Sequence, residues 1–148
     1  MSTIAGSEIG ISSKSSSGID IGATLDTQVI SRWLRQTRHR AKANNIYSDI
    51  TLDQVIVIVE EKDGLCAYCD QPAATLDLAF PLHLGAPHVP ANVLPVCQNC
   101  KAKKGTNDIS WMFNSGIISK DLYVRLLQMM LRHAGHDKIR DQIRLVAG

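Results

Sequence analysis

Four cysteines in two Cys-x-x-Cys pairs are the residues of this chain whose spacing most directly indicates chemistry. The pairs are Cys66 with Cys69, and Cys97 with Cys100. Each pair can place two thiolates on one side of a tight turn, and two such turns supply the four sulfur ligands of a tetrahedral Zn²⁺ ion. A redox-active dithiol is the alternative for an isolated pair, but two pairs favour metal. Four protein ligands leave no open coordination position, so we expect a structural zinc site.

The segment between the two cysteine pairs is longer than the roughly 15–20 residues of a simple zinc ribbon, so it must contain structure of its own. The sequence predicts a strand over 75–80, a long loop over 81–90 and a returning strand over 93–96. A helix is expected to follow Cys100. Together these elements form a β-hairpin and a helix clasped by one metal ion.

The order of motifs resembles the HNH endonucleases in their four-cysteine zinc form. A Cys-x-x-Cys pair is followed by Asp77, Pro81, a glycine-containing loop with histidine, Asn92, and a second Cys-x-x-Cys pair with lysines after it. The preceding stretches RHRAKANNI and GLCAYC resemble phage and prophage members of that family. The resemblance covers about residues 31–108. It implies a ββα-metal fold and hydrolysis of DNA phosphodiesters with Mg²⁺ or Mn²⁺, giving 5′-phosphate and 3′-hydroxyl ends.

The resemblance also implies roles for individual residues, and two of them do not match. Asp77 corresponds to a ligand of the divalent ion, and Asn92 corresponds to the residue that braces the active-site loop. Leu78 stands where the family has the histidine that activates water, and Lys101 stands where it has another metal ligand. Leucine cannot accept a proton, and an ammonium group repels a cation.

Two interpretations of the altered centre remain open. His83 lies five residues beyond Leu78 and is a candidate substitute base, or it is an ordinary exposed loop histidine. Asp77 is either a divalent-ion ligand or a structural carboxylate with a partner in the protein. His88 occupies a loop position that is often histidine in active family members, so it is not expected to be the missing base.

Basic residues are concentrated in two stretches. An apolar face at Ile30, Trp33, Leu34, Thr37 and Ala41 predicts a helix from about residue 27 to residue 42. No acidic residue occurs in that stretch, so its basic side chains create a positive electrostatic field, and such a field attracts phosphate. The alternative is that these charges are only solvated. The candidate nucleic-acid contacts are Arg32, Arg35, Arg38, Arg40 and Lys42 in the helix, and Lys101, Lys103 and Lys104 after the second cysteine pair.

The remaining elements surround this centre. Residues 1–27 are rich in serine and glycine and indicate a flexible tail. The run VIVIV within residues 52–62 is typical of a strand, but the capping box of Thr51 and Gln54 favours a helix there. Apolar anchors surround an Asn-Ser-Gly turn in 111–118, a helix capped by Ser119 extends to residue 133, and a short helix is expected over 137–146. The sequence thus predicts an α+β chain with an HNH-like zinc domain over 28–110 and a C-terminal helical extension over 111–148.

Composition limits the function classes. The net charge is +2, the aromatic fraction is 5%, and no apolar run approaches the roughly 18 residues of a membrane helix. No secretory signal is evident, so an intracellular, cytoplasmic protein is expected. The resemblance to phage and prophage members implies that it can be phage-encoded. Three functions follow: a zinc domain that binds nucleic acid, duplex DNA first, with weakened or lost nuclease activity; an active endonuclease that uses His83; and an adaptor that binds a protein through its C-terminal helices or its tail.

Overall fold

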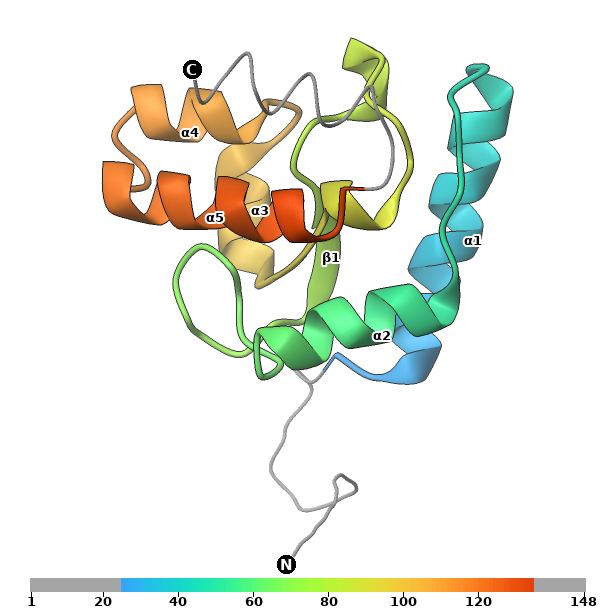
Figure 1. Cartoon of the computed structure of the whole chain (residues 1–148), viewed down its shortest axis with the longest axis horizontal. Coiled ribbons are helices and arrows are strands. Elements are labelled where there is room, and N and C mark those ends of the chain that lie inside the picture. The colour runs from blue at the N-terminus through green and yellow to red at the C-terminus, as the bar shows by residue number, and fades with distance from the viewer. Residues whose placement is uncertain (1–24, 135–148) are drawn as a thin grey trace, which may run out of the picture.

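The computed structural model describes residues 25–134, and these contain both helices and a small sheet (Figure 1). The helix expected over 137–146 and nearly all of the expected tail lie outside the described residues. The fold class is therefore mixed α and β, as predicted. Among the described residues, no helix is both long enough and apolar enough to span a bilayer.

The first two helices have the ends that their sequences predict. Helix α1 (Thr27–Ala43) begins where the Asp26 carboxylate accepts a hydrogen bond from Val29 N–H. Helix α2 (Leu52–Glu61) begins at Thr51, whose capping box with Gln54 is complete. This cap fixes the start of α2, although its β-branched residues have a weaker preference for a helix. The buried face of α1 consists of the five predicted residues, Ile30, Trp33, Leu34, Thr37 and Ala41.

The sheet is one antiparallel pair, β1 (Thr75–Leu78) and β2 (Val93–Val96), in which Asp77 is opposite Leu94. Between them lie two short 3₁₀ turns, η1 (Leu82–Leu84) and η2 (Pro90–Asn92). The prediction that the first strand extends to residue 80 was wrong by two residues. At Phe80 the Asn92 side chain makes the hydrogen bonds that a partner strand would make. Its Oδ1 accepts from Phe80 N–H and its Nδ2 donates to the Phe80 carbonyl, each at 2.8 Å.

Three helices complete the described chain. Helix α3 (Gln98–Lys104) begins before Cys100, not after it as predicted, because Cys97 acts as its N-cap. Helix α4 (Ile109–Asn114) was not predicted; it is short, and its cap is the Asp108 carboxylate, which accepts from Trp111 N–H. Helix α5 (Lys120–Arg132) starts after Ser119, as predicted.

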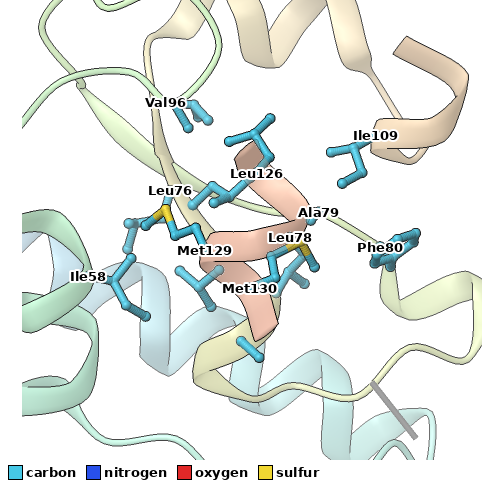
Figure 2. Packing of buried hydrophobic residues seen from close by; sticks show 14 of the residues in the cluster. Ile58, Leu76, Leu78, Ala79, Phe80, Val96, Ile109, Leu126, Met129 and Met130 are labelled. Carbon is cyan, nitrogen blue, oxygen red and sulfur yellow. The ribbon is translucent and has the colours of Figure 1, made fainter. Parts of the chain in front are cut away.

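One hydrophobic core joins the predicted zinc domain to the C-terminal helices. Figure 2 shows side chains of α5, among them Met129 and Met130, beside Leu78 of β1 and Ile58 of α2. These side chains are almost fully buried, and Ile109 of α4 belongs to the same cluster. Glu61 at the end of α2 also pairs with Arg132 and His133 at the end of α5. The helical extension thus shares one core with the strand that carries Asp77, and α5 contacts the η2 turn that precedes β2.

Candidate functional site

The four cysteines come together as the sequence predicts. Their sulfur atoms all lie within 4.8 Å of one another, and the Sγ atoms of Cys69 and Cys97 are 3.6 Å apart. Tetrahedral coordination with metal–sulfur bonds of about 2.3 Å requires sulfur separations of roughly 3.8 Å. A disulfide needs about 2.05 Å, and all four cysteines are free. The donor set therefore fits a metal ion held by four thiolates.

Local backbone geometry forms the two turns of this cluster. Gly64 and Asp70 adopt positive φ angles of 71° and 63° on either side of the first pair, and Asp70 N–H donates to the Cys66 carbonyl at 3.0 Å. Ala67 N–H donates to the Pro95 carbonyl at 2.8 Å, which ties this turn to β2. The first cysteine turn is thus fixed to the hairpin that it must face.

The second cysteine turn is continuous with α3. Cys100 N–H donates to the Cys97 sulfur at 3.4 Å. Although burial acts to raise it, hydrogen bonds from Cys100 and from neighbouring thiols lower the pKa of Cys97 to about 7. Burial, by contrast, raises the pKa of the Cys66 and Cys100 thiols, so metal binding would have to displace protons from the cluster.

Asn92 has the bracing geometry that the resemblance implies. Besides its two bonds to Phe80, its Nδ2 donates to the Pro87 carbonyl at 3.1 Å. The side chain is fully buried, so each of these bonds is made away from water. Asn92 therefore ties the 81–90 loop to the end of β1.

His88 is a buried connector between this loop and α1. It is fully buried, with Nδ1 2.7 Å from Ser48 Oγ and Nε2 2.7 Å from Thr37 Oγ1. Burial, and then the charges of Arg38 and Arg40, lower its pKa from 6.5 to about 4. Both ring nitrogens are occupied, so His88 does not face the place expected for a base.

Asp77 has a partner within the protein. The Nζ atom of Lys104 forms an ion pair with the Asp77 carboxylate at 2.9 Å. It also donates a hydrogen bond to the Leu78 carbonyl at 2.9 Å. The Tyr68 hydroxyl donates to the same carboxylate at 3.4 Å. Lys104 is 1% exposed and Asp77 is 8% exposed, so this is a buried ion pair. A lysine expected to contact nucleic acid is thus engaged inside the protein.

Lys101 is the second lysine of α3 that reaches β1. Its Nζ donates to the Leu76 carbonyl at 2.8 Å, and the side chain is half-buried. Leu76 is opposite Pro95, which has no N–H to offer a neighbouring strand. Burial lowers the pKa of Lys101, as do the charges of Arg40 and Lys104, whereas Asp77 acts to raise it.

Lys101 and Lys104 both line a cleft of about 310 Å³. Helix α1 contributes Arg40, the 81–84 segment contributes His83, and α3 contributes Lys101 and Lys104, while Asp77 and Leu78 come from β1. Three cationic side chains and one carboxylate line the cleft, which gives it a net positive charge. The candidate base His83 and the candidate ligand Asp77 therefore border the same space.

The other predicted basic contacts lie outside this cleft. Arg32, Arg35 and Lys42 are exposed on α1, and Lys103 is exposed on α3. Arg38 donates from Nη2 to the Ile50 carbonyl at 2.6 Å, which fastens α1 to the start of α2. The lining residues that sequence reasoning missed are Trp33, which was assigned only to the core, and Asn44, Leu82, Gly105 and Thr106, which carry no motif.

Comparisons of this chain with protein-family models, with curated proteins and with solved structures found no match. Function is therefore inferred from the cysteine cluster, the cleft and the resemblance in motif order.

Proposed function

We propose that this chain is an HNH-like zinc domain that binds the backbone of nucleic acid, duplex DNA first, with nuclease activity weakened or lost. The observation that carries the proposal is the cleft lined by Arg40 of α1 and Lys101 of α3, whose net charge is positive. A concave surface of one charge sign attracts a ligand of the opposite sign, and phosphate is the charged group that nucleic acid presents. The resemblance supplies the preference for duplex DNA.

Zn²⁺ is the metal proposed for the four-cysteine cluster. Thiolates are soft ligands, and zinc accepts four of them in a tetrahedron at the spacing that these sulfurs have. With four protein ligands the ion would have no position for water or substrate. Its contribution would be to hold the 66–70 turn and the start of α3 together, which fixes Lys101 relative to β1.

We propose that catalysis is weakened or lost because Leu78 stands where the resemblance implies the histidine that activates water. The Leu78 side chain is 8% exposed and belongs to the hydrophobic core, and it can neither accept nor donate a proton. A general base typically contributes about 10²–10⁴-fold to a rate, so its replacement lowers hydrolysis by that order without preventing binding.

The test is DNA affinity as a function of salt concentration. We expect Arg40→Ala to weaken binding to a short duplex by roughly 5–30-fold and to reduce the salt slope by about one. Lys120→Ala is the matched control, because Lys120 is an exposed cation on α5 outside the cleft lining. Equal effects of the two variants would remove the cleft from the proposal, and an affinity independent of salt would favour a protein partner over nucleic acid.

A second candidate function is an active endonuclease in which His83 replaces the missing base. The observation that favours it is that His83 lines the same cleft as Asp77. The test is nicking of supercoiled plasmid with Mg²⁺ or Mn²⁺ by the natural protein and by His83→Ala. Cutting that His83→Ala abolishes would establish this candidate. No cutting by the natural protein with either metal would support the non-catalytic proposal.

A further inference from the structure

The Asp77–Lys104 pair occupies the position at which the resemblance implies a divalent cation. Lys104 Nζ lies 2.9 Å from the Asp77 carboxylate and 2.9 Å from the Leu78 carbonyl oxygen, so its ammonium group already has two oxygen partners on β1. The lysine is 1% exposed. Its placement is fixed by α3, which begins at the cysteine cluster. The cation at Asp77 therefore belongs to the protein chain itself.

The residues around Asp77 do not fit a divalent ion. Mg²⁺ takes about six oxygen ligands at roughly 2.0–2.1 Å, and a carboxylate is its usual anchor in a protein. Asp77 is the one carboxylate among the residues that line the cleft, and its charge is balanced by Lys104.

We infer that the buried Lys104 ammonium replaces the divalent cation, so that the cleft binds a phosphate group of nucleic acid without any divalent metal. The nucleic-acid part of this inference rests on the proposed function. Because Lys104 neutralises Asp77, the charge left to face a ligand is that of Arg40 and Lys101. These are a forked guanidinium and an ammonium, the two groups that proteins most often use for phosphate.

Lys104 also makes the cleft insensitive to metal supply. In a metal-dependent site, phosphate and carboxylate share a cation that exchanges with solvent. Here the cation is tethered, and it is held by a backbone carbonyl as well as by Asp77. The positive charge of this cleft is therefore a fixed property of the folded chain.

The first experiment measures Mn²⁺ binding to the zinc-loaded protein, from the electron paramagnetic resonance signal of free Mn²⁺. We expect no Mn²⁺ site in the natural protein at Asp77, and a new site in Lys104→Ala that the second change Asp77→Asn removes. If Lys104→Ala does not fold, Lys104→Gln serves, because it removes the charge and fills more of the buried space.

Two outcomes of the Mn²⁺ measurement would overturn the inference. The first is a site in the natural protein that Asp77→Asn abolishes, because a divalent ion would then bind despite Lys104. The second is a folded Lys104 variant with no Mn²⁺ site, because Lys104 would then not be the group that excludes the ion.

The second experiment compares binding of a short DNA duplex in metal-depleted buffer and in buffer with Mg²⁺ at matched ionic strength. We expect the two affinities to agree within about twofold, since phosphate contacts respond to total salt. Binding that requires Mg²⁺ would overturn the inference and leave the proposed function standing. Absence of binding in both buffers would overturn the proposed function, while the Mn²⁺ result would still decide the role of Lys104.

Discussion

Replacing Lys104 with methionine should destabilise the protein far more than the same change at its exposed neighbour. Lys104→Met keeps an unbranched side chain one atom shorter than lysine and removes its charge. The Asp77 carboxylate then keeps the Tyr68 hydroxyl as a donor, and the Leu78 carbonyl loses its donor. Lys103→Met is the matched control, because Lys103 is the preceding residue of α3 and is exposed. The two variants differ in burial and not in chemistry.

The size of the effect follows from the geometry of the pair. Two unit charges 2.9 Å apart attract by about 6 kcal/mol at an effective dielectric constant of about 20, and the cost of burying both charges offsets much of this. Removing one partner of a buried pair costs about 3–5 kcal/mol, because the other charge stays buried without compensation. An exposed lysine replaced in this way changes stability by no more than roughly 0.5 kcal/mol. A domain has about 5–15 kcal/mol of stability in all, so we expect Lys104→Met to fold but weakly.

The measurement is urea unfolding in a fixed excess of zinc, with the free energy of unfolding compared at equal m-value. A double-mutant cycle with Asp77→Asn isolates the pair. We expect the variant with both changes to lose less stability than the two single losses added together, with a coupling energy of about 1–3 kcal/mol.

Equal losses in Lys104→Met and Lys103→Met would refute this account of the pair. Strict additivity in the cycle would do so as well, because it would mean that Asp77 and Lys104 do not interact in solution. If Lys104→Met fails to fold, Asp77→Asn alone decides the matter. It should also destabilise the protein, because Lys104 would lose its partner. If the Asp77 carboxylate had no partner, removing its charge would stabilise the protein instead.

Three further predictions concern the loop and the cysteine cluster. The folded pKa of His88 lies below its unfolded value, so stability is retained above pH 6.5 and should fall by roughly 3 kcal/mol as pH drops to about 4. Unfolding free energies at several pH values, compared with those of His88→Asn, measure this, and parallel curves would contradict it. Asn92→Leu should cost about 1–3 kcal/mol or more because it leaves the Phe80 and Pro87 carbonyls without their buried donor; an unchanged urea midpoint would contradict the bracing role. Cys69→Ser should lower metal content measured by elemental analysis and broaden thermal unfolding, and full metal occupancy in that variant would exclude Cys69 as a ligand.

Patterns within one segment of sequence predicted the helix starts and the cysteine cluster. The caps at Thr51 and Ser119 depend on residues three positions away, and the buried face of α1 depends on its own period. The two residues between the cysteines of each pair form the turn that places both sulfur atoms on one side. Such features need no knowledge of which distant segments meet.

The errors arose where distant segments meet. Lys104 was grouped with Lys101 and Lys103 because a run of lysines is usually solvated, and nothing local shows that it crosses to a carboxylate 27 residues earlier in the chain. The end of β1 depends on the Asn92 side chain, which comes from the far side of the loop. Helix α4 is too short for a periodic signal, and its buried Met112 and Ile109 fix it against the core.

The contacts of Lys101 and Lys104 with β1 have a further consequence for how this chain behaves at high concentration. A two-stranded sheet leaves backbone carbonyls on its outer side, and these can pair with a strand from another molecule. Here the carbonyls of Leu76 and Leu78 already accept hydrogen bonds from lysine side chains, and those side chains carry charge. The same two lysines thus occupy the carbonyl groups through which another strand could pair with β1. Variants in which both lysines are shortened should aggregate under conditions in which their helices are still folded.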